Sequence, residues 1–148
     1  MRALLQRVRF ARVRVDGVEI AAVGQGLLIF LGVAVGDAPG VETRLAERCA
    51  ELRIFEDKEG RMNCSVVELQ AEAIVVPQFT LCADVSRGRR PGFDGAAPPA
   101  VAERSFSSFC EQLGALGVRT QRGRFGASMD VELVNAGPAT FLLESPKG

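Results

Sequence analysis

Residues 131–144 read VELVNAGPATFLLE, an apolar strand pattern that is interrupted at Gly137-Pro138. A proline inside a strand removes one donor from the hydrogen-bond ladder and fixes φ, so a buried strand does not tolerate it without a reason. A second apolar run ends in Pro77-Gln78-Phe79-Thr80-Leu81. Because each interruption lies beside polar Gln, Asn or Thr side chains, we predict that both segments shape the backbone for contact with a ligand.

The rest of the chain alternates between strand and helix patterns. Residues 2–15 alternate apolar and polar side chains with a phase slip near residues 9–11, which predicts a strand with a bulge. Asp16-Gly17 is typical of a hairpin turn. Further strands are predicted over residues 18–23, 27–35, 64–69, 71–81, 118–122, 129–134 and 139–143.

Two helices are indicated by apolar stripes with helical spacing. The stripes are Val41, Leu45, Cys49 and Leu52, and then Ala102, Phe106, Phe109, Leu113 and Leu116. Pro98 and Pro99 favour the start of the second helix, after a loop over 83–99 that is rich in Gly, Pro and Arg. The order of elements predicts one α/β domain over residues 1–148, with a mixed β-sheet and two main helices.

The composition excludes several chemistries. The chain has no His, Tyr or Trp, so a Ser-His-Asp or Cys-His hydrolase site and a His-containing zinc site cannot form within it. No metal and no cofactor are expected. Its 18 basic and 18 acidic residues balance, which excludes a basic coat over the whole surface but permits a local basic patch.

The four cysteines have no CxxC spacing and apolar neighbours, which favours burial as small hydrophobic side chains. They are Cys49, Cys64, Cys82 and Cys110. The N-terminal residues alternate apolar and basic side chains instead of forming a signal-peptide core, and the longest apolar run, residues 26–35, is too short to span a bilayer. A cytoplasmic protein without membrane contact is predicted.

Several segments along the whole chain resemble the D-aminoacyl-tRNA deacylases, formerly called D-tyrosyl-tRNA deacylases. The matching segments are Gln6-Arg7-Val8, Leu52-Arg53-Ile54-Phe55, Met62-Asn63, Gln78-Phe79-Thr80-Leu81, Gly88-Arg89-Arg90-Pro91 with Phe93, Ala97-Pro98-Pro99, Gly123-Arg124-Phe125-Gly126-Ala127 with Met129, and Asn135-x-Gly137-Pro138-x-Thr140. A lone Gly-Pro carries no information, whereas this many segments in matching order are specific.

The resemblance implies a homodimer whose active sites lie at the subunit interface. Gln78 and Thr80 would come from one subunit, and the Gly137-Pro138 loop, with its Asn135, from the other. In the family the Gly-Pro bond is cis; its carbonyls capture the amino group of the substrate and the loop blocks an L-side chain. Arg7 resembles the arginine that orients this loop.

The chemistry that the resemblance implies is hydrolysis of the ester at the 3′-terminal adenosine of D-aminoacyl-tRNA, and of glycyl-tRNA. The 2′-hydroxyl of that adenosine would assist the reaction, with main-chain amides around Phe79 and Thr80 stabilising the oxyanion. An older family proposal makes the threonine, here Thr80, a nucleophile. No base in the sequence is placed to activate it.

Four further residues are candidates for contact with the adenosine or the tRNA. Phe125 and Met129 fit an adenine pocket, but both also fit core positions. Arg89 and Arg90, with Arg87, fit contacts to phosphates, but they fit a solvated turn equally well.

Three positions depart from the family pattern, and the departures leave alternatives open. Pro77 stands where the family usually has Ser, Ala136 where a polar or acidic residue is common, and Gly92 where Ser is common. Animal-type deacylases that act on L-alanine mischarged onto threonine tRNA also have Pro-Gln at this point. Arg7 and the Asn-x-Gly-Pro-x-Thr pattern side with the D-specific group.

The alternatives to a D-specific deacylase are a relaxed editor of L-Ala-tRNA, a non-catalytic tRNA-binding homologue, and a small-metabolite hydrolase or deaminase that works at a subunit interface.

Overall fold

A mixed six-stranded sheet forms the centre of the fold in the computed structural model, which describes residues 1–145. The last three residues of the predicted domain lie outside this part. The strands are β1 (Arg2–Val15), β2 (Val18–Val23), β3 (Gly26–Gly32), β6 (Glu72–Pro77), β7 (Arg119–Arg122) and β8 (Asp130–Glu144). They follow the order β2-β1-β3-β6-β7, and β8 pairs with β1. The β3–β6 and β6–β7 pairs are parallel and the others antiparallel, which confirms the predicted α/β class with a mixed sheet.

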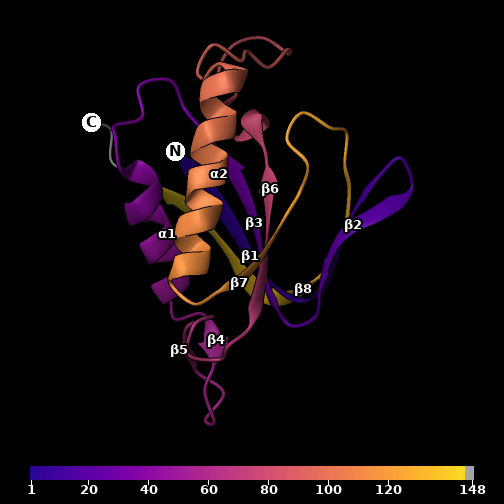
Figure 1. Cartoon of the computed structure of the whole chain (residues 1–148), viewed down its shortest axis with the longest axis vertical. Coiled ribbons are helices and arrows are strands. Elements are labelled where there is room, and N and C mark those ends of the chain that lie inside the picture. The colour runs from indigo at the N-terminus through magenta and orange to yellow at the C-terminus, as the bar shows by residue number, and fades with distance from the viewer. Residues whose placement is uncertain (146–148) are drawn as a thin grey trace.

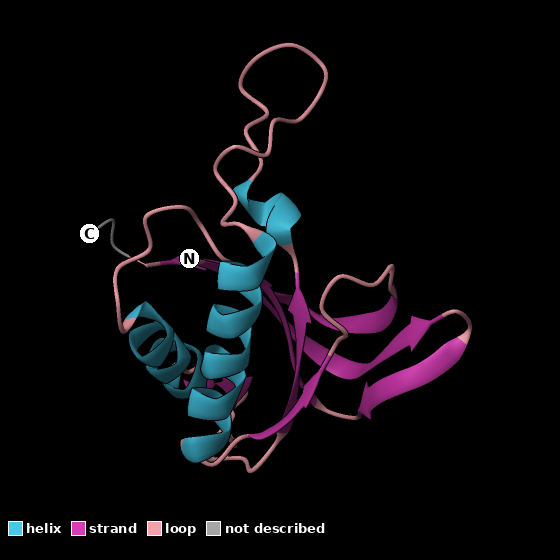
Figure 2. Ribbon diagram, turned by 45° about the horizontal axis from the view of Figure 1, so that its top comes forward, coloured by secondary structure: helices cyan, strands magenta, loops and turns pink. Residues whose placement is uncertain are grey.

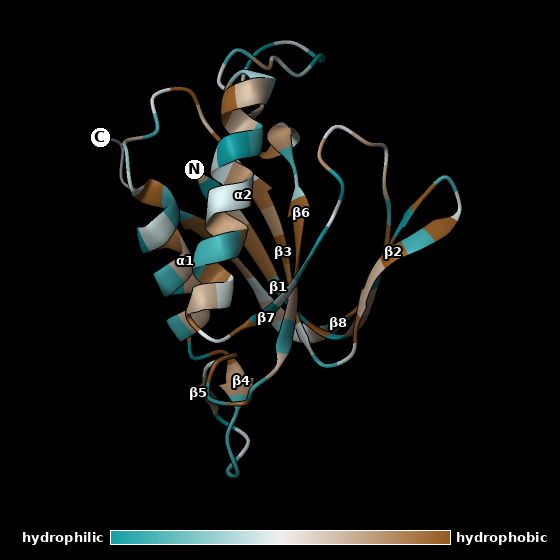
Figure 3. Cartoon of the chain, viewed as in Figure 1, coloured by the Kyte–Doolittle hydropathy of each residue, from teal (hydrophilic) through white to brown (hydrophobic). Residues whose placement is uncertain are grey.

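Two helices, α1 (Val41–Glu51) and α2 (Pro99–Ala115), pack side by side against one face of this sheet (Figures 1 and 2). Their predicted apolar stripes are buried, except that Leu52 and Leu116 form the C-caps and are only half-buried. Proline stands at the first position of α2, where a missing N–H costs nothing. Figure 3 shows the apolar residues gathered on the strands beneath the two helices.

Strand β1 shows the predicted phase slip. Ala3 and Leu5 pack in the core beneath the helices, whereas Val8, Ala11 and Val13 belong to a second cluster, formed with residues of β2, β3 and β6. The register with β8 shifts between Gln6 and Phe10, so the main irregularity begins earlier than the predicted residues 9–11. A further shift, with β2, follows at Val13.

The first and larger shift arises in β8, whereas the second arises in β1, where Arg9 is the extra residue between Val8 and Phe10. Gln6 pairs with Thr140 and Val8 with Asn135, so two steps along β1 correspond to five along β8. The residues between Asn135 and Thr140 therefore bulge out of the ladder as a short loop. Two strands were predicted here; the structure has one strand that resumes on the same edge of β1.

Three strand predictions are corrected by the structure. The predicted strand 27–35 ends at Gly32, where a Cβ would lie 3.0 Å from the Gln78 carbonyl oxygen of the crossing chain. The predicted strand 64–69 is wrong, because the chain turns after Ser65, whose Oγ accepts a hydrogen bond from the Glu68 amide at 3.1 Å. The predicted strand 71–81 stops at Pro77 and gives way to a 3₁₀ turn, η1 (Phe79–Cys82).

The remaining segments join these elements. Between α1 and β6 the chain forms a small hairpin of β4 (Phe55–Glu56) and β5 (Met62–Cys64). The predicted loop over 83–99 is confirmed up to the start of α2 and projects from the body (Figure 2). Cys49, Cys82 and Cys110 are buried and Cys64 is half-buried, all as free thiols. No helix among residues 1–145 is long and apolar enough to cross a membrane.

A single side chain joins β2 to β7. Gln121 donates from Nε2 to the Ala22 carbonyl at 2.7 Å and accepts from the Ala22 amide at 2.9 Å, so its amide group replaces a missing strand partner. We predict that Gln121→Leu lowers the free energy of unfolding by about 1–3 kcal/mol, because both backbone groups of Ala22 lose their partner. Urea unfolding measures this. Gln25→Leu, in the exposed turn after β2, is the control; an equal loss in both variants would contradict the assignment.

Candidate active site

The backbone turn that follows β6 carries one half of the predicted site. The Gln78 amide donates to the Leu31 carbonyl at 2.8 Å and so fixes the start of the turn on the end of β3. Leu81 and Ala83 donate to Gln78 and Thr80, respectively, and close η1. Within the described residues, neither the Phe79 nor the Thr80 amide donates to any acceptor. Both residues are exposed, so two adjacent N–H groups remain available to an external acceptor.

The side chains of this turn contribute no base. The Gln78 Nε2 donates to the Thr80 Oγ1, which therefore acts as an acceptor. A nucleophilic threonine needs a group that removes its proton, and an amide N–H cannot do this. Cys82 lies at the end of η1, where burial raises the pKa of its thiol. The described residues also lack any cluster of three or more acidic or Cys side chains that could hold a metal ion.

An apolar cavity of about 680 Å³ opens beside the turn. Its lining combines the end of β6 with the start of α2 and the loop before β8, including Pro77, Gln78, Phe79, Phe93, Phe106, Phe125 and Met129. The rings of Phe79 and Phe93 meet edge to face at 5.1 Å, and those of Phe106 and Phe125 lie 6.2 Å apart. A cavity with aromatic walls and few polar groups suits a flat heterocyclic ring.

Pro77 explains why the sheet ends at this cavity. The Gly123 amide donates to the Val75 carbonyl at 2.8 Å, and residue 77 would supply the next donor in this parallel ladder. Proline has no N–H, so the ladder stops and the chain leaves the sheet to form η1. A Cβ on Gly123 would lie 2.8 Å from Met129 Sδ and 3.2 Å from Pro77 Cδ, so a larger residue would have to displace the Met129 side chain at this end of β6.

The bulge in β8 carries the other half of the predicted site. The Gly137–Pro138 peptide bond is cis, and both residues are exposed. The buried Arg7 donates from Nε to the Ala136 carbonyl at 3.2 Å. Asn135 donates from Nδ2 to the carbonyls of Arg7 and Ala139, both at 3.2 Å, and so holds the base of the loop closed.

The two halves lie apart within one chain. Gly137, Pro138, Arg7 and Asn135 are not among the residues that line the cavity. The loop sits on β8 at the level of Arg7, whereas η1 begins three strands away, beside the other end of β3. From strand spacings this separation is roughly 20 Å, too far for both halves to act on one aminoacyl group.

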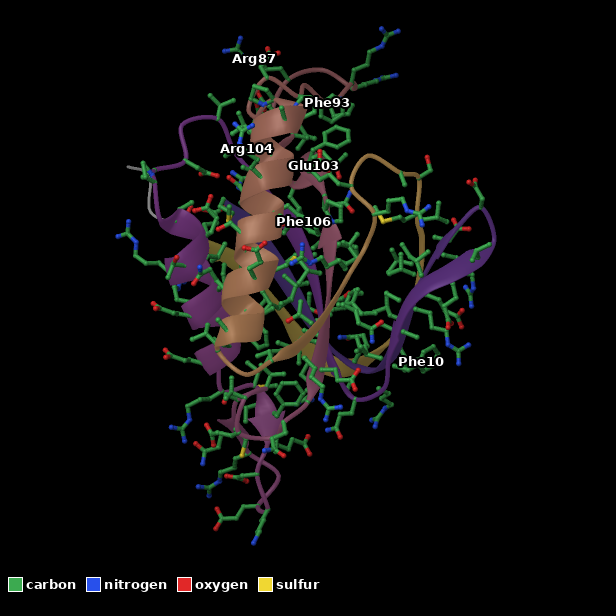
Figure 4. All side chains as sticks on the ribbon, in the orientation of Figure 1. Phe10, Arg87, Phe93, Glu103, Arg104 and Phe106 are labelled. Atoms are coloured by element: carbon green, nitrogen blue, oxygen red, sulfur yellow. The ribbon has the colours of Figure 1, made fainter. Side chains whose placement is uncertain are left out.

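The arginines singled out in the sequence lie on the projecting loop. Asp84 and Gly92 pair across its base, and Arg87, Arg89 and Arg90 are exposed at its far end. None of the three forms an ion pair within residues 1–145. The same loop carries Phe93 into the wall of the cavity, while Arg87 points away from the body (Figure 4).

Comparison with known proteins assigns the chain to a family. The model of the family described as D-Tyr-tRNA(Tyr) deacylase matches residues 4–144. A D-aminoacyl-tRNA deacylase from Roseiflexus castenholzii is 54% identical over 145 residues, which cover 98% of this chain and 92% of that protein. A D-aminoacyl-tRNA deacylase from Desulfatibacillum aliphaticivorans is 50% identical over 145 residues, which cover 98% of this chain and 99% of that protein.

Solved structures share the fold. The c-Myc DNA Unwinding Element Binding Protein is 39% identical, with a TM-score of 0.93 and 99% of both chains covered. A probable eukaryotic D-amino acid tRNA deacylase shares the fold at 20% identity, with a TM-score of 0.80. The match covers 96% of this chain and 97% of that one. The fold and sequence thus define an enzyme of the hydrolase class. The chain belongs to the D-Tyr-tRNA(Tyr) deacylase family.

Two aromatic residues of the cavity wall were missed as site residues in the sequence. Phe106 was predicted only as part of the apolar stripe of α2, and its position in the cavity wall depends on the packing of α2 beside the end of β6. Phe93 was noted only as part of a matching segment. Its proximity to Phe79 arises from the path of the long loop, for which the sequence offered no signal.

The cysteines give a test of the packing of the main core, to which Cys49 and Cys110 belong. Burial raises the pKa of Cys49 and of Cys110 to about 12, so at pH 8 each is ionised to roughly one part in ten thousand. We predict that a thiol reagent at pH 8 modifies the half-buried Cys64 first in the native protein, and all four cysteines in urea. Mass mapping identifies the sites; early labelling of Cys49 or Cys110 would contradict the packing.

Proposed function

We propose that this protein hydrolyses the ester bond of D-aminoacyl-tRNA and glycyl-tRNA, releasing the amino acid and free tRNA, as a proofreading step of translation in the cytoplasm. Membership of the deacylase family over nearly the full chain carries the proposal. The site geometry supports it, because two free amides stand beside an apolar cavity in a chain without histidine.

The cavity would receive the 3′-terminal adenosine. Phe79, Phe125 and Met129 would contact the base, since every base offers a flat face for stacking. The ester carbonyl would then lie against the amides of Phe79 and Thr80, which stabilise the developing oxyanion; one such donor is worth on the order of 3 kcal/mol. The neighbouring 2′-hydroxyl of the substrate would assist attack by water, since Gln78 and Thr80 supply no base.

The Gly137-Pro138 loop would select the amino acid from a second copy of the chain. The separation of roughly 20 Å within one chain, estimated from strand spacings, favours a homodimer with shared sites. Carbonyls of the loop would accept hydrogen bonds from the substrate ammonium, while the loop backbone excludes an L-side chain. Arg7 and Asn135 orient the loop through the contacts described above.

The projecting loop would contact the tRNA itself. Arg89 and Arg90 are exposed on this loop without acidic partners in the described chain, and guanidinium groups bind phosphates well. Phe93 ties this loop to the cavity, so a nucleotide bound in the cavity places the preceding backbone near the arginines.

Pro77 gives one alternative a specific basis. Its position in the cavity wall, next to Gln78 and Phe79, could extend activity to L-Ala-tRNA. The structural relative at 39% identity is named as a DNA-unwinding-element binding protein, so nucleic-acid binding is the property that it shares with the second alternative, a tRNA-binding homologue.

Deacylation of matched D-Tyr-, L-Tyr-, Gly- and L-Ala-charged tRNAs by the purified protein tests the proposal. We predict rapid loss of the D-Tyr and Gly esters and a far slower loss of the L-Tyr ester. Additional cleavage of L-Ala-tRNA would identify a relaxed editor. Binding without turnover of any ester would contradict the proposal, and equal cleavage of free amino-acid esters would indicate a small-metabolite hydrolase.

The backbone role of η1 predicts a contrast between two variants of one residue. Phe79→Pro removes one amide donor at the first position of the turn, where proline fits, so we expect kcat to fall by about 100- to 1,000-fold. Phe79→Leu keeps the donor and loses only aromatic contact, so KM should rise while kcat is largely retained. Single-turnover hydrolysis of D-Tyr-tRNA measures both; equal kcat values would contradict the role of the amide.

Assistance by the substrate 2′-hydroxyl, rather than attack by Thr80, predicts a second contrast. Thr80→Ala should retain substantial activity, because the hydroxyl is only an acceptor for Gln78. A substrate with a 2′-deoxy terminal adenosine should not be hydrolysed. Loss of activity in the variant with normal hydrolysis of the deoxy substrate would instead establish Thr80 as the nucleophile.

A further inference from the structure

The β4–β5 hairpin has no part in the proposed chemistry, although it contains segments that carry the family resemblance. Ile54 and Phe55 bury their side chains in the core, whereas most of residues 56–63 are exposed. In Figure 1 the hairpin lies at the end of the molecule opposite the projecting loop. It is therefore remote from the cavity, and the proposed chemistry does not account for its polar side chains.

Those polar side chains form a continuous network inside the hairpin. Asp57 accepts hydrogen bonds from the amides of Glu59 at 2.8 Å and Arg61 at 3.0 Å, and from Asn63 Nδ2 at 3.2 Å. Arg53 donates from Nε to the Asn63 carbonyl at 2.8 Å and from Nη2 to its Oδ1. Asn63 is the central member, because it joins the turn at Asp57 to the strand entry at Arg53.

The network leads directly to the Gly137-Pro138 loop. Ile54 follows Arg53, and its carbonyl accepts a hydrogen bond of 2.7 Å from Nη1 of the buried Arg7. The Nε of the same guanidinium donates to Ala136, and its Nη2 lies 4.0 Å from Glu56 Oε1. One planar group thus joins the hairpin to the loop, and its orientation is determined by both ends.

Burial of the Ile54 side chain does not by itself direct its carbonyl. The direction depends on the backbone torsions at the entry to β4, which follow from the pairing of Phe55 with Cys64 and from the Arg53–Asn63 contacts. If the carbonyl turns, Arg7 loses its shortest hydrogen bond and its Nε moves relative to Ala136. Displacement of a binding group by about 1 Å can cost as much as 100-fold in rate.

We propose that the β4–β5 hairpin sets the position of the Gly137-Pro138 loop through Arg7, and that Arg53 and Asn63 are positioning residues for discrimination between D- and L-aminoacyl esters. The identity of the substrate in this proposal rests on the proposed function. Neither residue touches the substrate; both act through the Ile54 carbonyl.

Asn63→Leu tests this, because leucine is similar in size to asparagine but cannot form its side-chain hydrogen bonds. We expect the ratio of kcat/KM for D-Tyr-tRNA over L-Tyr-tRNA to fall at least about tenfold. Lys58→Ala, in the same exposed turn but outside the network, is the matched control and should keep the wild-type ratio. An unchanged ratio in Asn63→Leu overturns the proposal. So does an equal loss on both substrates with a lowered melting temperature, because this would indicate a merely structural role.

A second measurement does not depend on activity. In backbone amide NMR spectra, the signals of Ala136, Gly137 and Ala139 should shift in Asn63→Leu and in Arg53→Met, but not in Lys58→Ala. Signals that stay in place would overturn the proposal even if deacylation is normal. If the wild-type protein hydrolyses no charged tRNA but the signals shift, the proposed function fails while support of the loop by the hairpin stands.

Discussion

The pairing of β1 with β8 is the constraint on which both the sheet and the proposed site depend. β1 also pairs with β2 and β3, so a change in its register would displace three neighbours at once. The extra residues of β8 are accommodated only because β1 slips phase at the same level. Arg7 lies at this slip, which allows its side chain to be buried and to reach the Ala136 carbonyl.

Backbone groups, rather than side-chain acids and bases, are what this fold presents at its two candidate positions. Pro77 ends the ladder between β6 and β7, so the chain turns out of the sheet and leaves the amides of Phe79 and Thr80 without acceptors among residues 1–145. The bulge in β8 exposes Gly137 and Pro138 on a loop held at its base by Asn135. In the proposed reaction the substrate would supply the proton acceptor, since the chain has no histidine.

Local sequence patterns predicted the elements that depend on the spacing of apolar side chains or on the backbone chemistry of proline. The helices, the hairpin at Asp16-Gly17 and the interruptions at Pro77 and Pro138 follow from periodicity and proline chemistry. The end of β3 and the turn after Ser65 did not, because they depend on a crossing chain and on one side-chain hydrogen bond. The cavity wall at Phe93 and Phe106 depends on tertiary packing between segments far apart in sequence.

Completion of each site by a second chain is the central claim, and mixing two inactive variants tests it most directly. Phe79→Pro would disable the turn and Gly137→Val would disable the loop. A Cβ at position 137 would already lie 3.3 Å from Asn135 Oδ1, so the larger valine side chain crowds the loop. If the halves come from different subunits, the re-formed mixture regains about a quarter of the wild-type rate on D-Tyr-tRNA, because about half of its dimers are mixed and each of these has one intact site of two. No recovery in verified mixed dimers would contradict the account.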